Sequence, residues 1–256
     1  MTRRALVALT VAAVAIAVVG GAPPAHATGG KPSGELTVFA ASSLTESFTA
    51  VAKQFEKRYP DVTVKFDFDS SANLAAQIQQ GAPADVFASA DEANIRKAVD
   101  SGDVNTKPVV FAKNRLEIAV EKGNPKKVSG LADLAKSGLV VVLCADAVPC
   151  GKYAAQAFAN AGVSVSPASK EENAKATLSK VSLGEADASV VYVTDVRAAK
   201  GEVSGVKIPD RQNVIATYPI AVTKENRGSA AAKAWVQFIQ SKTAQTTLRK
   251  FGFLPR

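Results

Sequence analysis

Serine residues stand at two points where a predicted strand gives way to a predicted helix. Ser43 follows the strand at 35–40, and Ser71 follows the strand at 62–68. A helix N-terminus presents free backbone N–H groups and a partial positive charge, and it therefore suits an anion. A third helix start, at Cys150, follows the strand at 139–143. Because such turns gather beyond the carboxyl ends of strands in open α/β sheets, the spacing predicts an anion site there.

Each serine also has a plainer interpretation as a helix cap. The segment 43–46 (SLTE) matches a capping box, in which the serine and the glutamate satisfy donors of the helix itself, and Ser71 is of a type common at the N-cap. The two roles can coexist, because a hydroxyl can accept from the helix and donate to an oxyanion. Neither serine has a lysine or arginine beside it, which favours a site that holds a dianion with dipoles and hydroxyls.

The first residues of the chain predict export. Two arginines, Arg3 and Arg4, precede an apolar run over 5–19, and a small-residue site at 25–27 follows it. This order is typical of a secretory signal peptide over 1–27, cleaved near Ala27, with a Gly/Pro/Ser linker over 28–34. The run is shorter than the roughly 20 residues of a spanning helix, and an uncleaved anchor is the alternative. We expect the mature protein on the periplasmic or extracellular side of the cell envelope.

The scarcity of histidine and cysteine excludes several chemistries. The only histidine, His26, lies in the predicted signal peptide, so the mature chain has no imidazole for a Ser-His-Asp or Cys-His mechanism or for a zinc site. The only cysteines are Cys144 and Cys150. In an exported chain such a close pair favours a disulfide over a metal site, with free buried thiols as the alternative. We therefore expect no bare metal ion and no cofactor.

The net charge of +8 does not by itself indicate a nucleic-acid partner. The basic residues are spread along the chain, whereas nucleic-acid binding usually needs a concentrated basic patch, so we expect none. Apolar residues make up 47% of the chain, which is enough for a substantial core, and the length fits two modest domains or one large one.

Strands and helices alternate along the chain, which predicts an α/β protein with mainly parallel sheets. The predicted strands are 35–40, 62–68, 86–88, 116–121, 139–143, 188–192 and 215–222, the last interrupted by Pro219. The predicted helices are 44–59, 72–80, 92–101, 131–136, 152–160, 173–183, 194–200, 230–240 and 244–251.

Five stretches, in order along the chain, resemble the periplasmic molybdate-binding proteins. They are VFAASSLTESF at 38–48, GAPADVFASAD at 81–91, VPCGKYA at 148–154, VVYVTD at 190–195 and YPIAV at 218–222. The resemblance implies a type II periplasmic-binding-protein fold, in which two α/β lobes enclose a ligand cleft and are joined by two crossover hinge strands. Lobe I would comprise 35–110 and 218–256, and lobe II would comprise 111–217.

The resemblance also implies a ligand and the residues that hold it. The ligand would be molybdate or tungstate, which a monomeric, non-enzymatic protein would deliver to the membrane permease of a molybdate ABC importer. Ser43 and Ser71 would donate hydroxyl and backbone N–H groups from lobe I. Cys150 and Ala174 would donate backbone N–H groups, and Tyr192 its phenol, from lobe II. The family often has alanine at the Cys150 position and valine at the Ala174 position, and backbone donors survive both changes.

Other functions stay open on the residues alone. The segment 204–207 (SGVK) matches the Ser-x-x-Lys pattern of some serine hydrolases, but we place it in a loop that runs to Pro209 and opens no apolar helix. Sulfate or another small oxyanion would suit the same fold, and the choice of molybdate rests on the resemblance. Asp85 and Asp91 are interpreted as turn or helix-start residues, because a carboxylate beside a dianion would have to be protonated.

Overall fold

The computed structural model describes residues 31–104, 106–224 and 229–256. The predicted signal peptide over 1–27 and the first residues of the predicted linker lie outside these ranges. Within the ranges, no helix is both long enough and apolar enough to cross a membrane.

Strands and helices alternate as expected over most of the described chain. The strands are β1 (Gly34–Ala41), β2 (Val62–Asp69), β3 (Val86–Ala88), β4 (Val109–Glu121), β5 (Val141–Cys144), β6 (Ser169–Glu171), β7 (Ala188–Tyr192), β8 (Val203–Lys207) and β9 (Ile215–Val222). The α-helices are α1 (Thr45–Arg58), α2 (Ser71–Gln79), α3 (Glu92–Asp100), α4 (Pro149–Ala161), α5 (Ala174–Ser182), α6 (Val193–Ala198), α7 (Ala230–Ile239) and α8 (Lys242–Phe251), and the 3-10 helices are η1 (Ser42–Leu44) and η2 (Leu131–Ala135).

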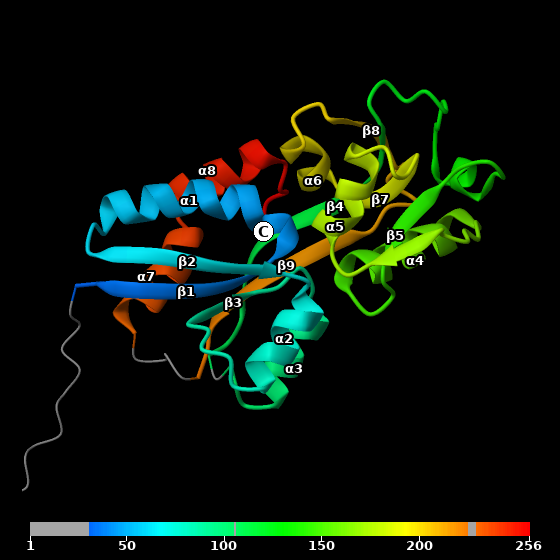
Figure 1. Cartoon of the computed structure of the whole chain (residues 1–256). Coiled ribbons are helices and arrows are strands. Elements are labelled where there is room, and N and C mark those ends of the chain that lie inside the picture. Colours follow the sequence, from blue (N-terminus) through cyan, green and yellow to red (C-terminus); the bar gives the residue numbers. More distant parts are fainter. Residues whose placement is uncertain (1–30, 105, 225–228) are drawn as a thin grey trace, which may run out of the picture.

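The strands form one sheet along the length of the molecule (Figure 1), in the order β2-β1-β3-β9-β4-β7-β5-β6, with β8 paired to β4. β1 runs parallel to β2 and β3 in the first half, and β5 runs parallel to β6 and β7 in the second half. Between the halves, β4 and β9 run antiparallel to each other and to their outer neighbours. These two strands therefore carry the chain from one half of the sheet to the other and back.

The sheet is mixed, whereas the sequence analysis expected mainly parallel strands. The alternation of strands and helices predicts the parallel strands within each half of the sheet. It does not reveal that β4 and β9, which cross between the halves, run antiparallel to each other and to their neighbours. The short polar strand β6 and the first part of β4 were also missed, since β6 has no apolar alternation to signal it. Pro219 does not interrupt β9. It lies opposite Val110, next to an irregularity of β4, where proline is tolerated.

The segment 204–207 lies in β8 rather than in a loop. Its residues pair with β4, from Ser204 opposite Val120 to Lys207 opposite Glu117. Gly205 favoured a loop in the sequence, because glycine is common in loops. In the structure, a Cβ at this position would come within 2.8 Å of the Glu117 carboxyl group. The glycine therefore makes room for a side chain of the neighbouring strand, and the Ser-x-x-Lys spacing falls on an extended strand instead of a helix start.

Helices cover both faces of each half of the sheet. In the first half, α1, α7 and α8 pack on one face while α2 and α3 pack on the other. β1 accordingly alternates, with Leu36 and Val38 in one core and Phe39 in the other. In the second half, α4 lies on one face and α5 with α6 on the other. The larger core continues through both halves.

Aromatic packing fixes the helix that follows η1. The predicted apolar stripe of α1 is buried, and both Phe48 and Phe55 are fully enclosed. Each packs edge-on against Trp235 of α7, with ring centroids 5.7 Å and 5.1 Å apart. Edge-to-face pairs of this kind stabilise a core beyond the area that they bury. They hold α1 against α7, which itself packs on β1 and β9, and so support the position of α1 directly after η1, where Ser43 lies.

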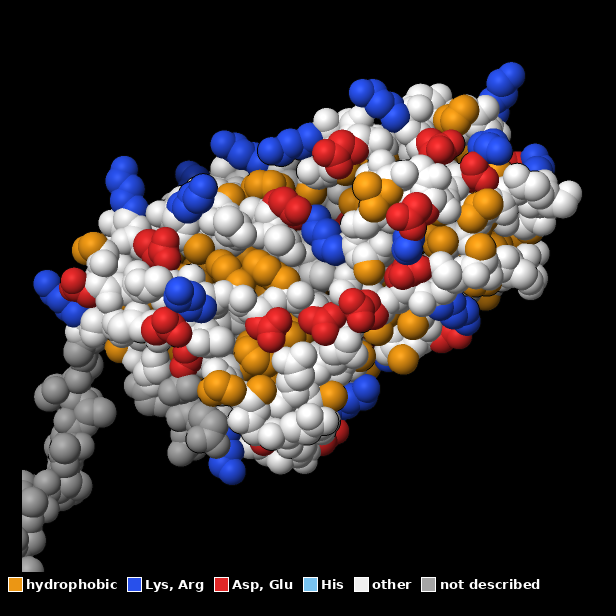
Figure 2. Space-filling view, viewed as in Figure 1, with side chains coloured by type: hydrophobic (Ala, Val, Ile, Leu, Met, Phe, Trp, Pro, Cys, Tyr) orange, Lys and Arg blue, Asp and Glu red, His pale blue; other side chains and the backbone are white. Residues whose placement is uncertain are grey.

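Charged side chains of both signs are mixed over the visible surface. On the face shown in Figure 2, many lysine and arginine side chains lie along the upper edge, while aspartate and glutamate side chains are spread over the face and form a row across its middle. This face therefore presents no continuous basic patch.

Candidate functional site

A small cavity is lined by residues of both halves of the sheet, at a place where strands end and helices begin. The lining residues are Ala41, Ser42, Ser43, Asp69, Ser70, Ser71, Ala90, Pro149, Cys150, Asn173, Ala174 and Tyr192. They come from η1 and the starts of α2, α4 and α5, from the ends of β1, β2 and β7, and from the residues that follow β3. All five residues that the resemblance assigned to a ligand are among them.

Ser71 lies at the first position of α2 and does not cap it. The N-cap is Ser70, whose Oγ accepts from the Asn73 N–H at 3.2 Å. The Ser71 Oγ accepts instead from the Ala90 N–H at 2.9 Å, which leaves its own proton available to the cavity. The interpretation of Ser71 as a cap is therefore wrong by one residue, because the helix starts one residue earlier than the sequence analysis placed it.

Ser43 does not cap a helix either. It lies in the middle of η1, and no side chain caps η1 or α1. The 3-10 turn moves the start of α1 to Thr45, so the capping-box spacing of segment 43–46 no longer matches the helix. The Ser43 Oγ lies 2.8 Å from the Tyr218 Oη, and this hydroxyl pair replaces the expected cap.

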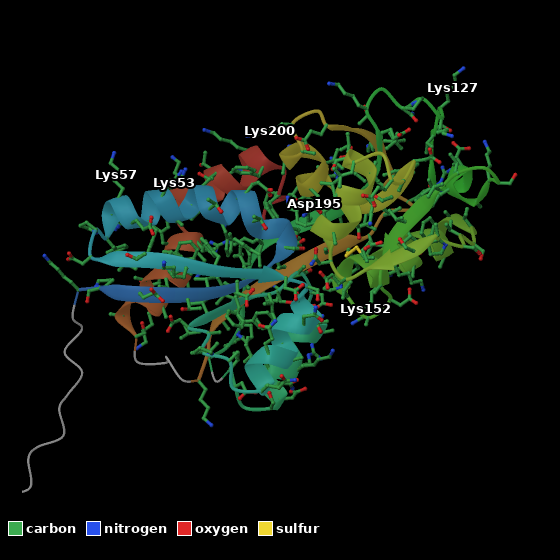
Figure 3. The ribbon with its side chains drawn as sticks, viewed as in Figure 1. Lys53, Lys57, Lys127, Lys152, Asp195 and Lys200 are labelled. Carbon is green, nitrogen blue, oxygen red and sulfur yellow. A yellow bond between two sulfur atoms is a disulfide. The ribbon has the colours of Figure 1, made fainter. Side chains whose placement is uncertain are left out.

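The start of α4 is fixed by a disulfide and a glycine. Cys144 at the end of β5 is bonded to Cys150 in the first turn of α4 (Figure 3), as expected from the sequence. A Cβ on Gly151 would come within 2.0 Å of the Ala145 carbonyl oxygen, so glycine alone allows this close approach. Since the first N–H groups of a helix have no partner within it, the N–H of Cys150, which lines the cavity, has no partner inside α4.

α5 presents its first turn to the same cavity. Asn173 is its N-cap, and the Asn173 Oδ1 accepts from the Ala176 N–H at 2.9 Å. That bond satisfies the third residue of the helix and leaves the Ala174 N–H, at the first position, without a partner inside the helix. The small side chain of Ala174, which is buried, leaves the space beside this N–H open.

Tyr192, the last residue of β7, brings an unpaired hydroxyl to the cavity. Only 1% of the residue is exposed, and its Oη has no hydrogen-bond partner among the described residues. Burial raises the pKa of the Tyr192 phenol well above its ordinary value, so the hydroxyl keeps its proton. An unsatisfied buried hydroxyl is destabilising, and an acceptor in the cavity would remove that cost.

The cavity holds neutral donors and no cation of its own. Among the described lining residues, Asp69 is the only charged one. Its carboxylate is occupied by three donors: the Ser70 N–H at 2.6 Å, the Asn73 Nδ2 at 2.9 Å and the Asn173 Nδ2 at 3.1 Å. The negative charge of Asp69 is thus turned towards protein donors.

Two polar pairs beside the cavity join the halves of the sheet. Asp69 and Asn173 form one pair, and Glu46 and Lys175 form the other, an ion pair. Neither pair was predicted from the sequence, because the two partners of each pair lie more than a hundred positions apart and leave no local pattern. Asn173 could have been found as the N-cap that precedes Ala174, but its partner could not.

The arrangement suits the binding of a small group that accepts hydrogen bonds. The Ser43 and Ser71 hydroxyls contact a tyrosine and a backbone amide, and neither has a base beside it in the described contacts. Residues 31–104, 106–224 and 229–256 contain no group of three or more His, Cys, Asp or Glu side chains that could hold a metal ion. A small group rich in hydrogen-bond acceptors matches what the cavity offers.

The fold and the site together define a solute-binding protein of the type II periplasmic class. Helices cover both halves of the sheet, two strands cross between the halves, and both halves line one cavity. The chain belongs to the bacterial extracellular solute-binding protein family, whose sequence model matches residues 36–254. Members of this family are transport components rather than enzymes.

Individual relatives agree with this assignment. The chain is 38% identical to the molybdate-binding protein ModA of Mycobacterium tuberculosis strain H37Rv, over 90% of this chain and 89% of that protein. The periplasmic molybdate-binding protein of Azotobacter vinelandii has a similar structure, with a TM-score of 0.74 at 22% identity over 86% of this chain and 100% of the other. The sulfate-binding protein SubI of M. tuberculosis H37Rv matches with a TM-score of 0.76 at 21% identity, over 86% of each chain. The family resemblance of the five motifs is confirmed, and the two structures show the shared fold.

One buried carboxyl group beside the cavity is not neutralised by a direct partner cation. Asp195, in the first turn of α6, lies in the interior near the middle of the molecule, whereas Lys57, Lys127 and Lys200 point outward (Figure 3). Its Oδ2 accepts from the Tyr192 N–H at 3.1 Å, and its Oδ1 has no partner within the described chain. Burial raises the pKa of Asp195 from 3.8 to about 6.

This raised pKa predicts a pH dependence of stability. Between pH 4 and pH 6 the folded state holds the Asp195 proton more tightly than the unfolded state, so the free energy of unfolding should fall as pH rises, by about 2–3 kcal/mol. Above about pH 6 this contribution should be constant. Asp195→Asn should reduce the slope in urea unfolding of the ligand-free protein by this contribution, while Asp61→Asn, at an exposed site, should leave it unchanged. A full slope in Asp195→Asn would contradict this assignment.

Proposed function

We propose that this chain captures molybdate, and also tungstate, outside the cell membrane and delivers it to the permease of an ABC importer. It acts as a monomer and a binding protein without catalysis, after cleavage of a signal peptide near Ala27. The observation that carries the proposal is the convergence of five neutral donor residues on one cavity whose described lining has no lysine, arginine or histidine. The 38% identity to a molybdate-binding protein supports the choice of ligand.

The proposed ligand contacts come from both halves of the molecule. Ser43 and Ser71 donate hydroxyl and backbone N–H groups from one half. Cys150 and Ala174 donate N–H groups, and Tyr192 its O–H, from the other. A tetrahedral dianion has four oxygens that only accept, and its burial is tolerable only when each oxygen meets donors. The positive ends of the helices add electrostatic stabilisation without a counter-ion.

The size of the cavity favours a compact ligand. The cavity is small, with a volume of about 10 Å³, which is close to the minimum that holds one water molecule. A small oxyanion fits a site of this scale better than an organic molecule. Sulfate is the second candidate, because it has the same shape and charge and because a sulfate-binding protein has the same fold. Molybdate differs from sulfate in its longer bonds to oxygen, and a direct competition separates them.

Capture involves movement of two lobes in this proposal. Lobe I comprises 35–110 and 218–256, lobe II comprises 111–217, and the boundaries fall within the crossing strands β4 and β9. Because the oxyanion meets all its donors only when the lobes are together, its binding shifts the population towards the closed form. The Asp69–Asn173 and Glu46–Lys175 pairs belong to that closed form.

Ligand choice is tested by calorimetric titration of the mature protein with molybdate, tungstate, sulfate and phosphate. Molybdate and tungstate should bind tightly, and sulfate and phosphate should bind at least about 100-fold more weakly, a difference of about 3 kcal/mol. Equal or tighter binding of sulfate would refute the molybdate assignment and support the second candidate.

The role of Tyr192 is tested by Tyr192→Phe, which keeps the ring and removes the donor. Loss of one hydrogen bond to a charged group should weaken molybdate binding by about 1–3 kcal/mol, or roughly 5- to 150-fold. Because the hydroxyl is unpaired in the described structure, the melting temperature without ligand should stay the same or rise.

Tyr59→Phe is the matched control, because Tyr59 follows the far end of α1 and should leave affinity unchanged. Wild-type affinity in Tyr192→Phe would show that Tyr192 does not contact the ligand, and it would remove the main support for the contacts from lobe II.

A further inference from the structure

Behind Ser43 lies a row of buried polar groups, which we call the Ser43 network: Ser43, Tyr218, Asn114 and Thr194. The Tyr218 Oη lies 2.8 Å from the Ser43 Oγ and 3.4 Å from the Asn114 Nδ2, which also donates to the Thr194 Oγ1 at 2.9 Å. All four residues are buried, and Ser43 alone among them lines the cavity. The network passes through β9 and β4, the two crossing strands.

Asn114 fixes the direction of the hydrogen bonds in this network. Its Oδ1 accepts from the Arg115 backbone N–H at 2.9 Å. A backbone N–H can only donate, so the carbonyl end of the amide belongs there and the NH₂ end faces Tyr218 and Thr194. An amide NH₂ has no acceptor capacity. The Tyr218 hydroxyl must therefore accept from Asn114.

The proton of Tyr218 then has a single destination. In the described part of the chain, the Ser43 Oγ is the only acceptor within hydrogen-bonding distance of the Tyr218 Oη. Burial raises the pKa of Tyr218 far above its ordinary value, so the phenol keeps this proton. Since buried hydroxyl protons are almost always donated, Tyr218 donates to Ser43. The proton of Ser43 must point away from Tyr218, and the cavity lies on that open side.

We propose that Tyr218 and Asn114 are positioning residues that hold the Ser43 hydroxyl as a donor towards the bound oxyanion. The inference rests on the proposed function and deepens it, since neither residue touches the ligand. If the order were reversed, Ser43 would donate to Tyr218 and turn an oxygen lone pair towards the anion, which would repel it. With the order fixed, Ser43 presents a proton before the ligand arrives, so binding requires no rearrangement of this bond.

A double-mutant cycle tests whether Tyr218 acts through Ser43. Ser43→Ala, Tyr218→Phe and the double variant are titrated with molybdate, and each is melted without ligand. Tyr218→Phe keeps the ring that packs edge-on against Phe253 at 5.3 Å. Alone it should weaken binding about 2- to 10-fold, and in the Ser43→Ala background it should have less than about a 2-fold effect. Equal losses in both backgrounds would overturn the proposal, because a purely structural role does not depend on the Ser43 hydroxyl.

A second variant, Asn114→Asp, reverses the direction of the hydrogen bonds in the Ser43 network. It tests the proposal even if Tyr218→Phe fails to fold. Asn114→Asp replaces the NH₂ by an oxygen that accepts from Tyr218, so that Tyr218 accepts from Ser43 and withdraws its proton from the ligand. Binding should weaken about 10- to 100-fold, and by much less in the Ser43→Ala background. The same loss in both backgrounds would assign the effect to the added charge and overturn the proposal.

Failure of the proposed function gives a different pattern from failure of this inference. If the wild-type protein does not bind molybdate, the proposed function is wrong. If Ser43→Ala binds molybdate with wild-type affinity, Ser43 does not contact the ligand, and the network has no ligand contact to act on. Clear weakening by Ser43→Ala together with strictly additive effects of Tyr218→Phe would leave the function in place and overturn only the role of the network.

Discussion

Burying a doubly charged anion away from water without a counter-charge is possible only where every oxygen meets a donor, and the described cavity is lined by groups that suit this requirement. Backbone N–H groups at helix starts are a compact source of such donors, because the first N–H groups of each helix have no hydrogen-bond partner within that helix. The described cavity gathers the starts of α2, α4 and α5 together with η1. Helix starts can meet in this way only where strands end side by side, as they do at one edge of each half of the sheet. Gly151 and the disulfide then serve the same end, because they let α4 begin close to the preceding loop and hold its first donors at the cavity.

The need for correctly oriented donors also accounts for the buried polar groups that the two halves share behind the cavity. The strands β4 and β9 connect the halves, and they carry Asn114 and Tyr218 directly behind the donor Ser43. The Tyr218 ring packs edge-on against Phe111, Tyr192 and Phe253, so the hydroxyl has little freedom to move. A buried network whose members are all satisfied fixes geometry. In the proposed role of this network, the geometry that it fixes is the direction of the Ser43 hydroxyl proton.

Much of this could be predicted from the sequence, and the omissions have physical causes. The α-helices and the parallel strands other than β6 were evident from the apolar pattern, as in the stripe of α1, and the five motifs led to residues that do line one cavity. The alternative interpretation of Ser43 and Ser71 as helix caps was wrong, because a 3-10 turn precedes α1 without a side-chain cap and α2 starts one residue earlier, with Ser70 as its cap. The doubled serines at 42–43 and 70–71 were visible, but only Ser70 caps a helix, and all four serines line the cavity. Tyr218 was recognised only as part of a motif, because its contacts to Ser43 and Asn114 link positions far apart in the chain.

The central claim is that neutral donors from both halves alone hold the oxyanion, and a crystal structure of the mature protein with molybdate tests it most directly. Data collected at the molybdenum absorption edge locate the metal without reference to any prior interpretation. The account predicts one strong anomalous peak in the cavity lined by Ser43, Ser71, Cys150, Ala174 and Tyr192, with ligand oxygens about 2.7–3.1 Å from their donors. A peak outside this cavity, or a lysine or arginine side chain as the principal partner of the oxyanion, would contradict it.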